Sequence, residues 1–226
     1  LNMGCPMPKI VGNGDGCALM RDEALAARIV EAVCGAVSVP VTVKMRTGWD
    51  KGSVNCVSLA QAVEAAGASA VTVHGRTKTM LYSGVADWDA IRAVVGAVKI
   101  PVIANGDVFD ETAALRCKAR TGAAGYMIGR AAFGDPWIFQ RVQAALRGED
   151  VPERLPLDAR MDTALRQIEL AAEDKGEHIA CLEARKHLAW YLRGVAYSGY
   201  YKEKIPAIST MDEVYNIVNG IKRDLK

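Results

Sequence analysis

The sequence lacks any long apolar run, any Cys-x-x-Cys pair and any secretion signal. No hydrophobic stretch approaches the roughly 20 residues of a membrane-spanning helix, and the first residues lack the basic and then apolar pattern of a signal peptide. The six cysteines are scattered, which fits neither a zinc site nor the dense disulfide framework of a small secreted domain. We therefore expect a cytoplasmic protein with reduced thiols and no membrane partner.

Histidine and net charge are also scarce. The three histidines have no His-x-x-His or His-Glu-x-x-His spacing, so we expect no metal. A net charge of +2 and a pI near 8.2 are too mild to indicate a nucleic-acid-binding protein by themselves. Between residues 185 and 204, however, five basic side chains accompany one acidic residue, Glu203. This local excess is the charge signal that favours an anionic partner.

Half of the 226 residues are hydrophobic, enough for a sizeable core, and the apolar residues include short β-branched runs. These runs are VTVKMR (41–46), AVTVHGR (70–76), PVIANGD (101–107) and AGYMIGR (124–130). Each is almost continuously apolar before a polar end, as expected of parallel strands buried on both faces. They start 23 to 31 residues apart, the length of one βα unit. A fifth strand would end at Leu1 and Asn2.

Helical patterns fill the intervals. The segment RDEALAARIVEAV follows the first strand end, and DWDAIRAVVGAV has Asp87 as its expected N-cap. In GDPWIFQRVQAAL, Asp135 as cap and Pro136 at the first helical position indicate a helix start. After about residue 147 no strand is indicated. Further helices are predicted over residues 157–173, 181–194 and 211–225.

Repeated βα units predict a parallel sheet, either doubly wound or closed as a barrel. Polar residues at successive strand ends favour the barrel, because those ends converge on one mouth. They are Asn2, Lys44, Arg46, His74, Arg76, Asn105, Asp107 and Arg130. We expect an α/β fold, a (β/α)8 TIM barrel over residues 1–147, and a small all-helical domain over 148–226. Because five strands cannot close such a barrel and no Met opens the chain, we expect the first three βα units to be absent.

Cys5 is the first candidate site residue. Gly4 and Pro6 fix the backbone beside it, and a polar loop follows, so a thiol held there can act as an acid or a nucleophile. The alternative, a small buried hydrophobe, is the more common use of cysteine. The loop GNGDG (12–16) matches no phosphate-binding spacing. A glycine loop that admits a bulky group is at least as good an interpretation.

The strand ends supply the other candidates. Lys44 and Arg46 alternate with Met45 and so point to the same side, into a barrel if it is one. Because buried lysine is rare unless paired or functional, we expect Lys44 to lie near an anion or an electron-rich ring. His74 and Arg76 repeat this arrangement one strand later. The repetition favours a ligand site over a structural histidine.

The last two strands end in glycine-containing segments, Asn105-Gly106-Asp107 and Gly129-Arg130. A glycine there lets a ligand approach the backbone, and a phosphate could bind between Gly129 and Arg130 near a helix N-terminus. The alternative is an ordinary turn. The presence of the first segment on the preceding strand favours the phosphate site.

Six segments resemble the bacterial tRNA-dihydrouridine synthases, most of all the B type. In order along the chain they are NMGCP with its glycine-rich loop, VKMRTGWD, VHGRT, IANGD, IGRAAFGDPW and EARKHLAWYLRG. The resemblance covers almost the whole chain. It implies an FMN-dependent oxidoreductase that reduces a specific uridine in tRNA to 5,6-dihydrouridine with NADPH or NADH. Reduced flavin would deliver hydride to C6 of the uracil, and a thiol would protonate C5. The uracil must leave its stack, which favours a flexible tRNA loop as substrate.

The resemblance also implies residue roles. It makes Cys5 the proton donor. It implies FMN contacts for Lys44, His74, Asn105, Gly106, Asp107, Gly129 and Arg130, and RNA contacts for Arg46, Arg76, Arg185, Lys186 and Arg193. Lys186 and Arg193 are seven residues apart, so on one helix they would share a face.

Two departures from the family accompany the resemblance. A first-strand FMN-binding motif and a later glutamine would both precede Leu1, and GVAYSGYYKEKIPA differs from the usual stretch at that place. One alternative is another FMN-dependent barrel reductase acting on a small molecule, like dihydroorotate dehydrogenase, but it leaves the basic helical tail unexplained. The other is a noncatalytic RNA-binding remnant. We expect a monomer.

Overall fold

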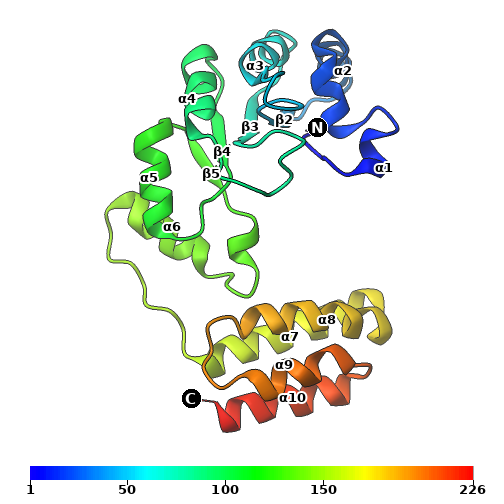
Figure 1. Ribbon diagram of the computed structural model, residues 1–226, viewed down its shortest axis with the longest axis vertical. Coiled ribbons are helices and arrows are strands. Elements are labelled where there is room, and N and C mark those ends of the chain that lie inside the picture. The colour runs from blue at the N-terminus through cyan, green and yellow to red at the C-terminus, as the bar shows by residue number, and fades with distance from the viewer. Residues whose placement is uncertain (226) are drawn as a thin grey trace. The chain divides into compact units, whose positions relative to one another are not determined.

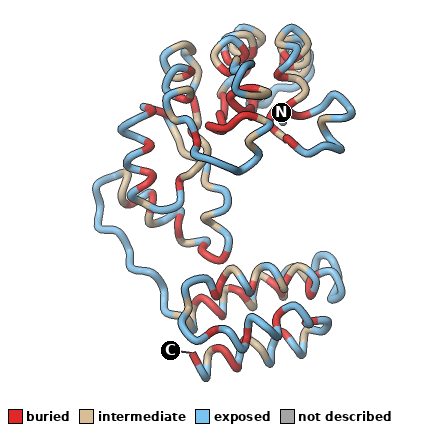
Figure 2. Tube along the Cα trace, in the orientation of Figure 1, coloured by how far each residue is buried: buried red, intermediate tan, exposed pale blue. Residues whose placement is uncertain are grey.

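The computed structural model describes residues 1–225, which form two compact units. The first unit comprises Leu1–Gly129 and Ala145–Arg147, and the second comprises Arg130–Ala144 and the residues from Gly148 on. Figure 1 shows the order of the elements, and Figure 2 shows buried residues along the strands and on one side of the helices. The second unit therefore begins earlier in the chain than the predicted boundary after residue 147.

The first unit is built on a five-stranded parallel sheet in the sequential order β1-β2-β3-β4-β5. Its strands are β1 (Asn2–Met3), β2 (Thr42–Arg46), β3 (Ala70–His74), β4 (Val102–Asn105) and β5 (Gly125–Met127). All five lie where the apolar runs predict them, which confirms the α/β class with a parallel sheet. A sequential order is that of a barrel wall, whereas a doubly wound sheet reverses its order at a switch point. Closure into an eight-stranded barrel stays a prediction.

Helices follow each of the first four strands. They are α1 (Pro8–Val11), α2 (Glu23–Ala36), α3 (Cys56–Ala65), α4 (Trp88–Ala97) and α5 (Glu111–Thr121), with a 3-10 helix, η1 (Gly16–Arg21), before α2. The predicted cap of α4 is confirmed, because the Asp87 carboxylate accepts a hydrogen bond from the Ala90 amide at 2.9 Å. Figure 1 shows α2 to α5 side by side along the sheet.

Alternation along the strands separates a core side from a polar side. Met45 and Val73 are fully buried at 0% exposure, as residues that face covering helices should be. Their neighbours Arg46 and His74 therefore point to the opposite side, and these two are register partners on β2 and β3. His74 pairs in turn with Asn105 on β4. The register thus aligns three polar strand ends in one row.

The second unit is helical. It contains η2 (Arg130–Ala132), most of α6 (Ile138–Arg147), α7 (Leu157–Lys175), α8 (Glu177–Tyr191), α9 (Gly199–Lys204), η3 (Ile205–Ala207) and α10 (Met211–Asp224). The helices predicted over 157–173, 181–194 and 211–225 correspond to α7, α8 and α10. Met161, Leu188 and Val218, one from each of these helices, belong to a single buried cluster. This core gives the unit its stability through apolar burial.

Two predicted helix limits are wrong. Helix α6 begins at Ile138 rather than beside Asp135, whose carboxylate is instead bound by the Arg141 guanidinium at 2.6 Å. The segment before α6 packs on α8, because the Phe133 ring stacks on the Trp190 ring with centroids 4.2 Å apart. Helix α8 ends at Tyr191, so Arg193 lies in the following turn and does not share a helix with Lys186.

Candidate active site at the carboxyl ends of the strands

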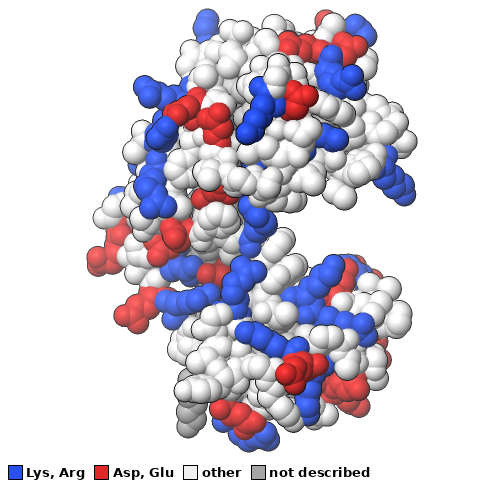
Figure 3. All heavy atoms as spheres, viewed as in Figure 1, with Lys and Arg blue, Asp and Glu red and all other residues white. Residues whose placement is uncertain are grey.

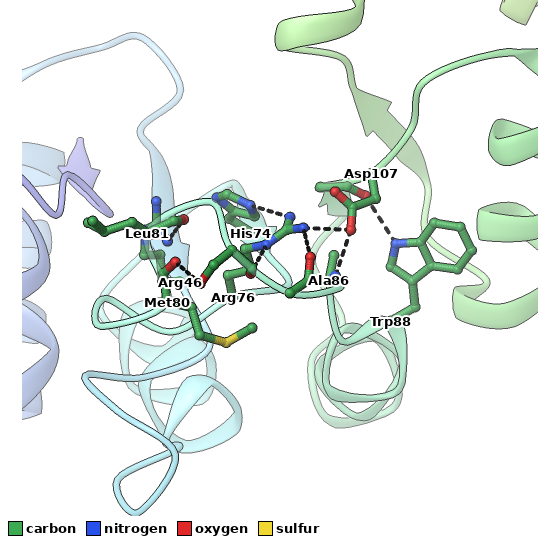
Figure 4. A network of polar contacts seen from close by, with 11 residues as sticks. Arg46, His74, Arg76, Met80, Leu81, Ala86, Trp88 and Asp107 are labelled. Carbon is green, nitrogen blue, oxygen red and sulfur yellow. Dashed lines mark hydrogen bonds and ion pairs between the residues drawn. The ribbon is translucent and has the colours of Figure 1, made fainter.

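Five predicted site residues gather at the ends of β2, β3 and β4, and we name them the strand-end cluster. They are Lys44, Arg46, His74, Arg76 and Asp107. Figure 4 shows four of them, together with the backbone groups that bind the two arginines. The positive charges outnumber the single carboxylate. The cluster therefore forms an electropositive region at the carboxyl ends of the strands.

Arg46 links the loops after β1 and β3 to strand β2. Its side chain is 2% exposed, its Nε donates to the Gly4 carbonyl at 3.0 Å, and its Nη1 donates to the carbonyls of Thr77 and Leu81 at 2.9 and 2.8 Å. Among the described residues it has no carboxylate partner. Because this buried guanidinium donates its hydrogen bonds to backbone carbonyls, it fixes the loops after β1 and β3 relative to β2.

Arg76 is also buried, at 2% exposure, but it has an acidic partner. Its Nη2 lies 2.7 Å from the Asp107 carboxylate, which also accepts the Ala86 amide at 2.7 Å. Further donors of Arg76 bind the carbonyls of Ser83 and Gly84. The pair thus holds the loop after β3 against the end of β4.

The predicted RNA contacts of Arg46 and Arg76 conflict with this burial. Each guanidinium is about as inaccessible as a core side chain and already donates to groups of the protein. Phosphate contact requires donors that solvent can reach. We therefore reassign both residues as positioning residues of the loops.

Gly106 is needed where His74 meets the next strand. Its φ of +113° is disfavoured for other residues, and a Cβ there would lie 2.9 Å from the Ala86 Cβ and 3.0 Å from the His74 Cδ2. Its carbonyl accepts the Trp88 indole N–H at 3.1 Å. The glycine therefore lets β4 approach the histidine ring closely.

Lys44 is a cation without a partner in the chain. Its side chain is partly buried, and no described residue forms a hydrogen bond or ion pair with it. Burial, and then the nearby Arg46, lower the pKa of Lys44 below its usual value. Such an ammonium group gains most from an anionic or electron-rich ligand that supplies the missing acceptors.

His74 is neutral at physiological pH. Burial, followed by the charges of Arg46, Lys44 and Arg76, lowers the pKa of His74 to about 3. The Arg76 Nη1 lies 3.4 Å from its Nε2, and because an arginine can only donate, Nε2 is the acceptor and Nδ1 carries the proton. The ring thus offers one N–H donor to a ligand.

The low pKa of His74 predicts a pH-dependent stability. A group whose pKa is lower in the folded than in the unfolded state loses stability as pH falls from about 6.5 toward its folded value. Between pH 7 and pH 5.5 the parent should lose about 1 kcal/mol more unfolding free energy than His74→Asn, which cannot be protonated. Urea unfolding of both proteins at the two pH values measures this. Equal losses would show that His74 is readily protonated in the folded protein.

The loop after β1 holds Cys5 from both sides. The Asn2 Oδ1 accepts the amides of Gly4 and Cys5, each at 3.0 Å, and the Cys17 amide donates to the Cys5 carbonyl at 3.0 Å. Gly16 has a φ of +58°, and a Cβ there would lie 2.7 Å from that carbonyl oxygen. The bulky group that approaches the GNGDG loop is therefore the chain itself at Cys5.

The thiol of Cys5 is reduced and partly buried, whereas Cys17 is fully buried. Burial raises the pKa of Cys17 to about 11. That Asn2 anchors this loop was not predicted from the sequence. The signal was available, because asparagine side chains often accept a hydrogen bond from the backbone amide two residues later and so form a turn. Of the two thiols, only Cys5 is accessible to a substrate.

The remaining cofactor candidates are placed differently. The Asn105 Nδ2 donates to the Met127 carbonyl at 2.8 Å, linking β4 to β5. Gly129 and Arg130 are both exposed, but Gly129 ends the continuous part of the first unit and Arg130 opens the second. Their shared phosphate site stays a prediction.

The predicted RNA-contacting residues of the helical unit differ in accessibility. Arg185 donates from Nε and Nη2 to the Ile208 carbonyl at 2.9 and 2.7 Å, so it links α8 to the segment before α10. Lys186 and Arg193 are exposed. Figure 3 shows where Lys and Arg side chains lie on the visible face of the protein. Only two of the three predicted residues have freely accessible charges.

Exposed tyrosines in this unit were missed from the sequence. Tyr197 is 95% exposed with a φ of +54°, and Tyr200 is 59% exposed with the Lys204 ammonium 4.3 Å from its ring centroid. Aromatic rings among cations are typical of surfaces that bind unpaired nucleic acid. The interleaving of tyrosine and lysine in GVAYSGYYKEKIPA was the available signal.

Residues 1–225 contain no group of three or more His, Cys, Asp or Glu side chains that could hold a metal ion. Within the same range, no helix is both long and apolar enough to cross a membrane.

Comparisons with known proteins give a consistent result. The family model described as dihydrouridine synthase (Dus) matches residues 1–225. The chain is 43% identical to a probable tRNA-dihydrouridine synthase of Rickettsia conorii over 202 residues, which cover 89% of the chain and 61% of that protein. It is 42% identical to tRNA-dihydrouridine synthase B of Vibrio cholerae over 221 residues, covering 97% and 68%. For tRNA-dihydrouridine synthase B of Pseudomonas aeruginosa the identity is 45% over 193 residues, covering 85% and 58%. The chain thus spans 58% to 68% of the length of these three relatives.

Proposed function

Because the chain belongs to the dihydrouridine synthase family, we propose that it carries the catalytic thiol and part of the cofactor site of an enzyme that reduces uridine in tRNA to 5,6-dihydrouridine. The observation that carries the proposal is the placement of Cys5. Asn2, Gly16 and Cys17 fix its backbone, and Arg46 links that loop to the strand-end cluster through Gly4. An accessible thiol is thereby held next to an electropositive site.

The residues fit FMN as the cofactor. The partnerless ammonium of Lys44 suits an electron-rich ring edge, the neutral His74 offers an N–H donor, and Gly106 leaves no side chain over the ring of His74. Gly129 and Arg130 would hold the phosphate. When bound, FMN supplies hydride transfer, after reduction by NADPH or NADH.

The protein's own groups would perform the acid and positioning steps. Cys5 Sγ would give its proton to C5 of the uracil, and the fixed backbone would keep the thiol at the correct distance. Arg46 and Arg76 would hold the loops after β1 and β3 in place without touching the RNA. The helical unit would bind RNA phosphates through Lys186 and Arg193, and the exposed ring of Tyr197 would be available to stack on a base.

Lys44 gives a test of the cofactor site. Lys44→Ala should weaken FMN binding roughly tenfold to a hundredfold, because one charge-assisted hydrogen bond contributes about 1.5 to 3 kcal/mol. Fluorescence titration of the deflavinated protein with FMN measures the affinity. Lys51→Ala, an exposed lysine on the turn after β2, is the matched control and should leave it unchanged. Equal FMN affinity in Lys44→Ala and the parent would remove Lys44 from the site.

The reaction itself is tested on tRNA that lacks modifications. Incubation with the purified protein, FMN and NADPH should add two hydrogens to a uridine, which mass spectrometry of the nucleosides detects. A flavin-loaded protein that oxidises NADPH but leaves the tRNA unchanged would contradict the proposal and favour a small-molecule reductase. The proposed place of action is the cytoplasm, and a monomeric state stays a prediction.

A further inference from the structure

A second group of cations lies on the loops that follow β1, β2 and β3, outside the strand-end cluster. The Arg21 guanidinium carbon is 4.8 Å from the ring centroid of Trp49, and the Lys78 ammonium is 4.6 Å from it. We name these three residues the Trp49 cluster. They come from the end of η1, the loop after β2 and the loop after β3, so three separate segments converge on one indole.

The backbone around Trp49 is tightly fixed. The Lys78 amide donates to the Gly48 carbonyl at 2.9 Å, and the Thr79 amide donates to the Trp49 carbonyl at 3.0 Å. Gly48 pairs with Val54 across a short turn, and a Cβ at position 48 would lie 2.4 Å from the Ser53 carbonyl oxygen. The backbone that carries the indole is therefore fixed next to the backbone of Lys78.

The two charges have no acidic partner. Neither Arg21 nor Lys78 has a hydrogen bond or ion pair from its side chain to a described residue. The acids next to this cluster in sequence are occupied, since Asp22 caps α2 and Asp50 accepts the Gly52 amide and the Ser53 hydroxyl. Two like charges held on one ring are stabilised by an external anion.

A cleft of about 500 Å³ adjoins the cluster, with Met20, Arg21, Trp49 and Val54 among its lining residues. This volume lies within the range of small-ligand sites and is large enough for a nucleotide. Arg21 is at the end of η1, whose first residue, Gly16, contacts Cys5. Lys78 follows Thr77, whose carbonyl is bound by Arg46. The cluster thus belongs to the same loops that hold the thiol.

We propose that Arg21 and Lys78, oriented by Trp49, bind a phosphodiester of the RNA strand whose uridine is presented to Cys5. This inference rests on the proposed function. The ligand chemistry is a nucleotide phosphate bound by paired cations beside a cleft that polar and apolar side chains line together, Asp50 among them. The phosphate could come from RNA or from the dinucleotide reductant, and we assign it to RNA because the cluster lies on the loops around the thiol.

The test is the salt dependence of tRNA binding to Arg21→Gln with Lys78→Gln. A plot of log K against log salt concentration has a negative slope, and each phosphate contact with single-stranded RNA contributes about 0.7 to its magnitude. Loss of two contacts should therefore make the slope less negative by about 1.4. Arg28→Gln, an exposed arginine on α2, is the matched control and should keep the parent slope. The single variant Arg21→Lys should keep a slope close to that of the parent, because lysine retains the positive charge that contacts the phosphate.

Two further measurements separate the outcomes. The assignment to RNA would be overturned if the double variant had the same salt-dependence slope for tRNA binding as the parent. A raised KM for NADPH together with that unchanged slope would assign the site to the dinucleotide instead. FMN content and the melting temperature should match the parent, because neither residue contacts the strand-end cluster. If the parent itself binds tRNA without forming dihydrouridine, the proposed reaction fails while the slope comparison still decides the phosphate site.

Discussion

Cys5→Ala is expected to lower dihydrouridine formation by about 10²-fold to 10⁴-fold, the usual contribution of a positioned general acid. In the proposed reaction, hydride transfer to C6 would leave C5 of the uracil basic, and Cys5 would supply the proton from the loop after β1. FMN affinity should not change, because Cys5 is held by Asn2 and Cys17 through its backbone, which alanine retains. Single-turnover measurements with reduced protein and excess enzyme give the chemical step directly.

Cys34→Ala is the control for this variant. Cys34 is also a partly buried, reduced thiol, but it lies on α2 and its Sγ donates to the Gly67 carbonyl. Its replacement should leave turnover within about twofold of the parent, as expected of a side chain that takes no part in proton transfer. Turnover of Cys5→Ala within a fewfold of the parent would remove Cys5 from the acid role.

Asp107→Ala is expected to destabilise the protein by about 3 to 5 kcal/mol, because it leaves the buried charge of Arg76 without its partner. The Ala86 amide also loses its acceptor. Asp107 has a φ of +57°, a conformation that alanine adopts less readily than aspartate. Asp107→Asn keeps an acceptor oxygen and the tolerance for this backbone, so its destabilisation should be smaller.

The exposed pair of Asp89 and Arg120 provides the comparison. Both side chains are 59% exposed, so water replaces the lost partner and Asp89→Ala should change stability little. Urea unfolding of the three variants measures the difference in one assay. Similar losses for Asp107→Ala and Asp89→Ala would mean that solvent reaches Arg76 in the folded protein.

The strands could be predicted because the information is local. Apolar runs with polar ends appear wherever a parallel strand is covered on both sides, and β2, β3 and β4 follow this rule. The placement of Lys44 and His74 followed from alternation along two such strands. The start of α6 could not be predicted, because Asp135 binds the side chain of Arg141 and the residues before the helix pack on Trp190.

The roles of the arginines depend on residues distant in sequence. Arg46 donates hydrogen bonds to the carbonyls of Thr77 and Leu81, and Arg185 donates to the carbonyl of Ile208. A sequence pattern shows that a cation is present but not which carbonyl groups a later loop brings to it. The burial of Arg46 and Arg76 argues against direct RNA contact for this physical reason, whereas the exposed Lys186 keeps its assignment as a proposal.

The closed base of the loop between Cys5 and Gly16 has a consequence for sequence variation. The Cys17 amide and the close contact of Gly16 join the two ends of residues 6–15, so the position of the thiol does not depend on the length of chain between them. Doubling the length of such a flexible loop costs only about 0.6 kcal/mol of closure entropy. Insertions among the exposed residues from Gly12 to Asp15, which follow the short helix α1, can therefore accumulate without moving Cys5. This segment is a place where related enzymes could acquire new contacts while the reacting sulfur stays fixed.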